Sequence, residues 1–328
     1  MKLPKMNAVL FKDMQQQVKK ARMSVIIFII NLILFIIAGI TMLSISSNYT
    51  SHYAVDNRIL IDLFLGLIVT ESVLIGIMVP SFTAGTISGE RERQTMDVLL
   101  TTKMTPWEIV KGKYWSSIMQ MLLLLVSGLP IFALVFVYGG ISFFQVLLVI
   151  GVVITSLMFF ASIGVYFSAV MKKTGGATVL TFIMMLMYMF GTMLFVLIAY
   201  AIVESYNSYC YYTLQSIPTH NYYHIGPTVF VLYLNPLTTV FEVLARSFGT
   251  EVDYVQMNGM ATLIKELDMV PYKESNFFLR FWGIISLAVQ MGMTYLHLRL
   301  AAKALDPLRA RRGKNARQGK RQINTSVY

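Results

Sequence analysis

Charged residues are scarce in this sequence of 328 residues: Asp, Glu, Lys and Arg make up 13%, whereas 56% of the residues are hydrophobic. A soluble domain normally has about 25% charged residues, so this chain lacks the polar surface that water would require. Cysteine is also nearly missing, because Cys210 is the single one. One cysteine excludes an internal disulfide framework and a cysteine-rich metal site.

Nucleotide-binding and hydrolase motifs are missing as well. The sequence has no G-x-x-x-x-G-K-[ST] stretch to hold phosphates, and neither H-E-x-x-H nor G-x-S-x-G occurs. His220 and His224 have the spacing of two metal ligands on a helix, but no carboxylate or cysteine is near them in sequence. We therefore expect no catalytic residue, no metal site and no cofactor in this chain. If the protein uses ATP, another chain must bind it.

Long apolar runs are what the sequence has instead. Each run is long enough to cross a membrane as a helix, and each is continuous rather than alternating as in a β-barrel. The runs are residues 23–43, 63–87, 114–137, 146–170, 177–203 and 279–300. The first has no small-residue cleavage site behind it, so we expect a retained helix rather than a signal peptide. The predicted fold is an all-α integral membrane protein with six transmembrane helices within residues 23–303.

Basic residues indicate how these helices are oriented. Six spans place both termini on one side of the membrane, and 22 of the 27 Lys and Arg residues then lie on that side. This is the bias of a cytoplasmic face, so both termini are expected to be cytoplasmic. The net charge of +11 is mostly this bias, and we expect no nucleic-acid partner. The basic tail, residues 304–328, could bind RNA or anionic lipid, but such tails are the ordinary form of the bias.

Two segments beside the spans have amphipathic character. In residues 1–22, apolar residues recur at helical spacing between Lys and Gln, which predicts a helix lying on the cytoplasmic membrane surface. Residues 204–278, on the external side, are rich in tyrosine, which favours the membrane boundary. Within this segment "NPLTTVFEVLARSF", from Asn235 onward, predicts an amphipathic helix. We therefore expect short helices between the fifth and sixth spans.

The loop of residues 88–113 places nine charged residues between two apolar runs. Its apolar residues form a stripe at helical spacing: Met96, Leu99, Leu100 and Met104. Thr105, Pro106 and Glu108 have the spacing of a capping box with proline at the first helical position. The pattern predicts two short helices with a break near residues 103–105, the second running directly into the third span.

The motif "GERERQTMDVLL", followed by "TPWEIVKGK", resembles the cytoplasmic loop of permease subunits in the type-2 ABC exporter family. That family's pattern is G-E-x-E-x-G-T-x-x-x-L-L, then a Pro and a G-K before the third span. The matching residues are Gly89, Glu90, Glu92, Thr95, Leu99, Leu100, Pro106, Gly112 and Lys113. Gln94 stands where the family usually has a Gly before the Thr. We expect the helix to continue through Gln94, because Gln is the better helix former.

The resemblance implies a permease subunit of an ATP-driven exporter in a prokaryotic cytoplasmic membrane. Two ABC ATPase subunits, which bind ATP and Mg, would work with two permease chains, identical or homologous, among membrane lipids. The loop between spans 2 and 3 would form the coupling helix, which inserts its stripe into a groove on the ATPase and moves both spans as rigid bodies. The residues assigned to this coupling contact are Glu90, Arg91, Glu92, Arg93, Thr95, Met96, Leu99, Leu100, Met104 and Pro106.

Glu71 lies near the middle of the second span. A carboxyl group at that depth is costly and is by default a functional candidate: it could face a transport pathway, pair across a dimer, or move protons. The alternative is a protonated Glu that donates a hydrogen bond to a carbonyl of a neighbouring helix.

Two other functions compete with export. The first is a membrane scaffold or regulatory subunit that docks a soluble partner through residues 88–113 without transporting anything. The second is an intramembrane enzyme, which a second acidic or histidine residue facing Glu71 would favour. If the chain is an exporter, the scarcity of polar groups in the spans favours an amphipathic, lipid-like or peptide cargo.

Overall fold

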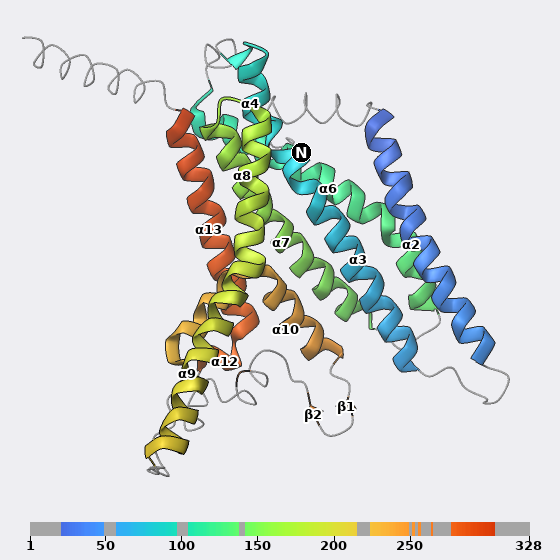
Figure 1. Ribbon diagram of the computed structural model, residues 1–328. Coiled ribbons are helices and arrows are strands. Elements are labelled where there is room, and N and C mark those ends of the chain that lie inside the picture. The colour runs from blue at the N-terminus through green and yellow to red at the C-terminus, as the bar shows by residue number, and fades with distance from the viewer. Residues whose placement is uncertain are drawn as a thin grey trace, which may run out of the picture.

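The computed structural model of the chain describes residues 21–48, 57–96, 104–137, 142–214, 224–248, 251–252, 255–256, 264 and 277–305. The long helices run side by side between two ends of the molecule, which we call the α4 end and the α10 end (Figure 1). The described residues are helical except for turns and two short strands, β1 (Glu251–Val252) and β2 (Val255–Gln256), which pair antiparallel. The predicted interfacial helix of residues 1–22 lies outside this part except for its last two residues. Of the predicted tail, residues 304–328, only the first two residues belong to the described part.

Five helices in the described residues are long and apolar enough to cross a membrane. The protein is therefore a multi-pass membrane protein, and the first five predicted spans all fall on these helices. The elements that form them are α2 (Ala21–Asn48), α3 (Asn57–Thr83) with α4 (Gly85–Glu92), α6 (Pro106–Val137), α7 (Phe143–Val170), and α8 (Thr174–Leu186) with η1 (Met187–Gly191) and α9 (Thr192–Leu214).

The sixth predicted span, residues 279–300, falls on α12 (Phe277–Arg280) and α13 (Trp282–Leu305). The helix α13 packs along α7, but it is not one of the five, because Gln290, His297 and Arg299 make it less apolar. A bent pair of helices has the composition of a span instead: η2 (Gly226–Leu234) and α10 (Pro236–Phe248) meet at 90°. The arrangement of exactly six spans thus stays a prediction.

Helix ends reach further than the apolar runs, because polar residues can continue a helix beyond the hydrocarbon layer. The third span begins at Pro106 rather than at residue 114, and the capping box predicted there is present. The Thr105 N–H donates to Oε2 of Glu108 at 2.8 Å, and the Glu108 N–H donates to Oγ1 of Thr105 at 3.3 Å. A second capping box, which the sequence did not suggest to us, starts α7 at Ser142.

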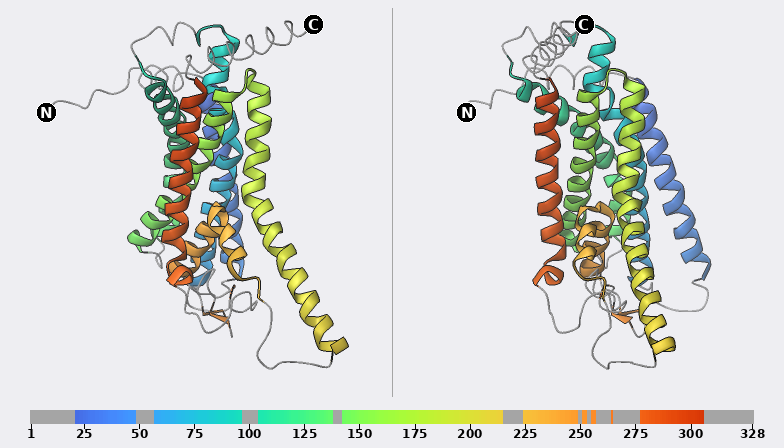
Figure 2. Two further views of the ribbon diagram at one scale, coloured as in Figure 1. Left: turned by 90° about the vertical axis from the view of Figure 1, so that its left-hand side faces the viewer. Right: turned by 60° about the vertical axis from the view of Figure 1, so that its left-hand side comes forward.

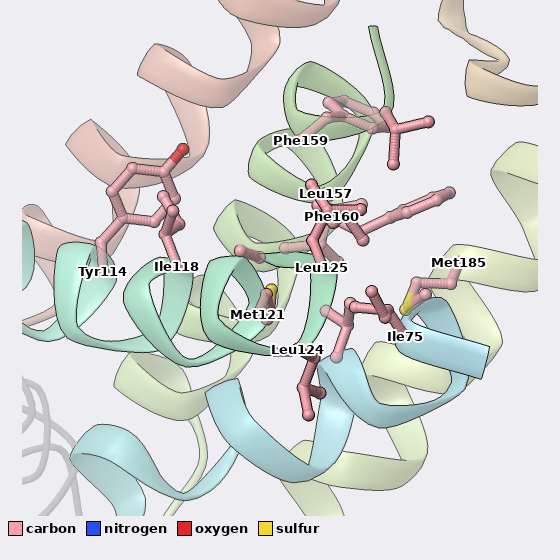
Figure 3. Close-up of a cluster of buried hydrophobic side chains, with 14 of the residues drawn as sticks. Ile75, Tyr114, Ile118, Met121, Leu124, Leu125, Leu157, Phe159, Phe160 and Met185 are labelled. Carbon is pink, nitrogen blue, oxygen red and sulfur yellow. The ribbon is translucent and has the colours of Figure 1, made fainter. Parts of the chain in front are cut away.

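The hydrophobic core lies where α3, α6, α7 and α8 meet. Side chains from all four helices gather there, among them Ile75, Leu124, Phe160 and Met185 (Figure 3). The helices α3 and α7 approach closely at Gly164, where a Cβ atom would overlap the side chain of Thr83. This packing fixes α3 and α7 relative to each other just below the α4 end.

A π-helical turn, η1, separates α8 from α9, and α9 continues away from the bundle at the α10 end (Figure 2). The turn is held by Asn235, whose Nδ2 donates to the Met189 carbonyl at 2.8 Å and to Oγ1 of Thr192 at 3.0 Å. The Oδ1 of Asn235 accepts from the Leu237 N–H at 2.9 Å and so caps α10. The predicted helix after Asn235 is therefore confirmed as α10, and its first turn is tied to η1.

Candidate functional site

The short helix α4 begins with its backbone N–H groups bonded to another helix. Oγ of Ser168, near the end of α7, accepts from the N–H groups of Ile87 at 2.9 Å and Ser88 at 3.0 Å. The N–H groups in the first turn of a helix have no partner within that helix, so the Ser168 side chain of α7 satisfies the Ile87 N–H and adds a bond to the Ser88 N–H.

The next two charged residues of the motif bond to α7 and α8. Arg91 donates from its two terminal nitrogens to the carbonyls of Met171 and Ala169, both at 2.8 Å. Glu92 accepts from the N–H of Thr174 and from its hydroxyl, each at 2.9 Å. A carboxylate at a helix N-terminus also interacts favourably with the helix dipole, so Glu92 serves as the cap of α8 from a distant part of the chain.

Glu90 connects α4 to the other end of the loop. Its Oε1 lies 3.1 Å from Nζ of Lys113 in α6, and Oε2 accepts a hydrogen bond from the Thr95 hydroxyl. The bonds of Ser168, Arg91, Glu92 and Glu90 together, which we call the α4 anchor, attach the base of the loop to α6, α7 and α8.

Gln94 corrects one expectation: α4 ends at Glu92, and Gln94 takes a left-handed backbone conformation with φ of 58°. The Thr95 N–H donates to the Glu90 carbonyl and the Gln94 N–H to the Arg91 carbonyl, which is a Schellman motif. The position requires a left-handed residue, for which glycine is the favoured type. Helix propensity of Gln is therefore irrelevant at this position.

The remaining coupling residues differ in exposure. Met96 is buried in the hydrophobic core, Met104 and Pro106 are half-buried, and the Arg93 side chain is exposed. Leu99 and Leu100 lie outside the described residues. The contact with an ATPase stays a prediction for all ten residues. Glu90, Arg91 and Glu92 have partners within the chain already.

Glu71 is completely buried between α3 and α6. Its carboxyl group packs against Gly128, where a Cβ atom would overlap it, and neither oxygen has a hydrogen-bond partner among the described residues. A second polar contact lies beside it, since Nδ2 of Asn31 in α2 donates to Oγ of Ser127 at 3.0 Å. The residues of α6 that contact Glu71 and Asn31 are therefore neighbours in the sequence, Gly128 and Ser127.

An apolar cavity of about 370 Å³ lies between α3, α7, α8, η1 and α10. Ser72 and Ser156 are the polar side chains among its lining residues, and both hydroxyls donate to carbonyls of their own helices. Val73, Ile77 and Phe190 line it and are exposed, so the cavity opens toward the outside of the chain. Glu71 is not a lining residue, although it adjoins Ser72.

Several buried polar residues were not singled out from the sequence. Nδ1 of His297 lies 3.1 Å from Oγ of Ser162, which joins α13 to α7. Gln290 donates to Oγ1 of Thr239 at 2.7 Å, and Glu242 pairs with Arg246. Polar residues in a span are a usable signal for such contacts. No hydrogen bond or ion pair links Glu71 to an acidic or histidine residue in the described part of the chain.

Metal ligands do not gather in the described residues, which contain no group of three or more His, Cys, Asp or Glu side chains able to hold an ion. His224 is half-buried at the start of η2, and His220 lies outside the described residues.

Comparison with known proteins places this geometry in a family. A search of curated proteins found no match to the chain. A family model described as "ABC-2 family transporter protein" matches residues 8–297. That match covers the loop, the α4 anchor and all the described helices except the last turns of α13. The chain therefore belongs to the ABC-2 family transporter proteins and is a type-2 ABC permease, a membrane transport component that works with an ABC ATPase.

Proposed function

We propose that the chain is the permease subunit of an ATP-driven exporter, in which two ATPase subunits bind ATP and Mg and move two permease chains, identical or homologous. The α4 anchor is the observation that carries this proposal. It makes the base of residues 88–113 continuous with α6, α7 and α8, so a push on the loop displaces packed helices as one body.

The α4 end is then the cytoplasmic side of a prokaryotic cell membrane. The excess of Lys and Arg assigned to that side from the sequence supports this orientation. In this arrangement α13 is the sixth span, and η2 with α10 re-enters the outer leaflet. Irregular backbone at membrane depth is tolerated where it is covered by protein, and the bonds of Asn235 to η1 provide such cover.

The apolar cavity supports an amphipathic or lipid-like cargo, with an apolar peptide as the alternative. A cavity whose polar side chains are two serines bonded to their own helices offers nothing to a strongly hydrophilic solute. The cavity opens beside α8 and α9, whose span has 17% of its most apolar window buried. A second permease chain against this side would close the cavity.

The test is a gentle-detergent purification of the tagged protein from its host, followed by identification of its partners. We expect a stoichiometric partner that has a nucleotide-binding site and hydrolyses ATP. Leu99→Asp with Leu100→Asp should remove that partner, because two charges would be forced into an apolar groove.

Lys172→Asp is the matched control, since it introduces an acid in the exposed turn between α7 and α8 at the same end of the molecule. The control should keep the partner. A partner without a nucleotide site, or none at all, would instead favour the alternative of a scaffold that docks a soluble protein without transport.

A further inference from the structure

At the α4 end, α6 and α13 bring aromatic and basic side chains together. The Arg299 guanidinium lies 4.7 Å from the ring of Trp107 and 5.0 Å from the ring of Tyr295. The two rings are 6.0 Å apart in an edge-to-face arrangement. Nζ of Lys111, on the next turn of α6, lies 5.5 Å from the same Trp107 ring. Lys303, one turn beyond Arg299, is exposed.

The Arg299 guanidinium of this cluster is available to a ligand, whereas Lys111 also interacts with the Glu108 carboxylate. Nε of Arg299 donates to the Tyr295 hydroxyl at 2.6 Å, which fixes the plane of the guanidinium. Its two terminal nitrogens form no hydrogen bond with a described residue. The nearby acid, Glu108, accepts from Thr105 as part of the cap of α6. The three basic groups, Lys111, Arg299 and Lys303, outnumber the single nearby carboxylate of Glu108, so the cluster has a net positive charge.

An apolar surface continues from the cluster toward the middle of the membrane. On α6 the first exposed residues after Lys111 are Trp115, Met119 and Leu123, and Val126 and Leu129 follow. On α13 the exposed residues before Arg299 include Ile284 and Met291. Each helix thus presents apolar residues, then an aromatic residue, then a cation. This is the order of chemistry met along a phospholipid from its chains to its phosphate.

We propose that the cluster of Trp107, Lys111, Tyr295, Arg299 and Lys303 binds the headgroup of an anionic phospholipid, whose acyl chains lie along α6 and α13. The planar Arg299 fork suits two phosphate oxygens, and Lys111 adds a point charge from the neighbouring helix. A lipid, rather than a free phosphate, fits because the cations stand at the end of two exposed apolar stripes. A contrast at the α10 end supports this: Arg280, the last residue of α12, lies 5.9 Å from the ring of Phe281 and has no second aromatic ring beside it among the described residues.

The experiment is native mass spectrometry of the purified full-length protein with added dioleoyl phosphatidylglycerol or dioleoyl phosphatidylcholine, which share their acyl chains. We expect tighter binding of the phosphatidylglycerol. Lys111→Gln with Arg299→Gln should weaken that binding by about fivefold for each cation removed, since a basic residue near the surface contributes about 1 kcal/mol. Binding of phosphatidylcholine should stay unchanged. This readout does not depend on transport or on an ATPase.

The matched control is Lys172→Gln with Arg280→Gln, which removes the same net charge at exposed positions outside the cluster. It should keep the preference for phosphatidylglycerol. Should the first variant fail to fold, added salt must weaken phosphatidylglycerol binding to the unaltered protein, because exposed charges are screened. Equal binding of the two lipids, an unaltered preference in Lys111→Gln with Arg299→Gln, or the same loss in the control would each overturn the proposal.

Discussion

Gln94 has a backbone conformation that residues with a Cβ atom disfavour. The residue ends α4 with φ of 58°, a conformation that costs a residue with a Cβ atom roughly 1–2 kcal/mol. Glycine avoids most of this cost because it has no Cβ atom. The way the helix ends therefore explains the glycine that the family pattern has here. In this chain Gln94 takes the position, between Glu90 and Thr95, which bond to each other.

Replacing Gln94 by Gly should stabilise the protein by about 0.5 to 1 kcal/mol, the relief of the left-handed conformation less the entropy that glycine loses on folding. The measurement is the melting temperature of the purified protein in one detergent. Gln94→Ala is the control and should bring no gain, because alanine retains the Cβ atom. A gain as large in Gln94→Ala as in Gln94→Gly would mean that the backbone conformation is not the cause.

The helix α4 is eight residues long and continues the span of α3, and its bonds to α6, α7 and α8 fix its position beyond that span. Arg91 spans two carbonyls at the end of α7, which a point charge such as Lys could not reach together. Arg93, two residues on, is exposed and its side chain has no hydrogen bond in the described part of the chain. Arg91 therefore anchors α4, and we predict that Arg93 contacts the ATPase.

Arg91→Ala should lower the melting temperature of the purified permease, because it leaves the part-buried carbonyls of Ala169 and Met171 without their donors, at a total cost of about 1 to 3 kcal/mol. Arg93→Ala should leave the melting temperature unchanged and weaken binding of the ATPase instead. Thermal unfolding and co-purification of the ATPase measure the two effects. Equal melting temperatures for the two variants would contradict the anchoring role of Arg91.

The helices themselves were largely predictable from the sequence, and their contacts were not. Apolar runs located the first five spans, and Thr105 with Glu108 located the start of α6, because these signals are local. The bond of Glu92 to Thr174 joins residues on separate elements, and no single sequence reveals such a pairing. The π-helical turn escaped prediction for the same reason, since Asn235 of the bent pair holds it from outside.

The molecule as a whole has an open side. The span formed by α8, η1 and α9 is among the least buried of the five, and the apolar cavity opens beside it. Exposed apolar side chains continue along α3 at Val69, Val73 and Ile77. Lipid can cover the exposed side chains of α3. The open wall of the cavity requires a surface of complementary shape, which the proposed second permease chain would provide.

Gly76→Phe should obstruct the cavity, because Gly76 lines it and no atom lies within 4 Å of the position of a Cβ atom there. We expect reduced binding of a fluorescently labelled phospholipid, by about tenfold, with little change in melting temperature. Gly66→Phe is the matched control on the same helix, where a Cβ atom also meets nothing and which does not line the cavity. Equal binding by the two variants would show that the labelled lipid binds elsewhere.

The bond from Glu92 to Thr174 also bears on how such permeases diversify. The segment that would meet the ATPase is not a portable module, because its base supplies the cap of α8 and the donors for the last carbonyls of α7. If this loop were replaced by that of a related permease, the residues at the positions of Arg91 and Glu92 would have to bond to the turn between α7 and α8 of this chain. A chimaera that is meant to accept another ATPase should therefore exchange the turn between α7 and α8 together with the loop.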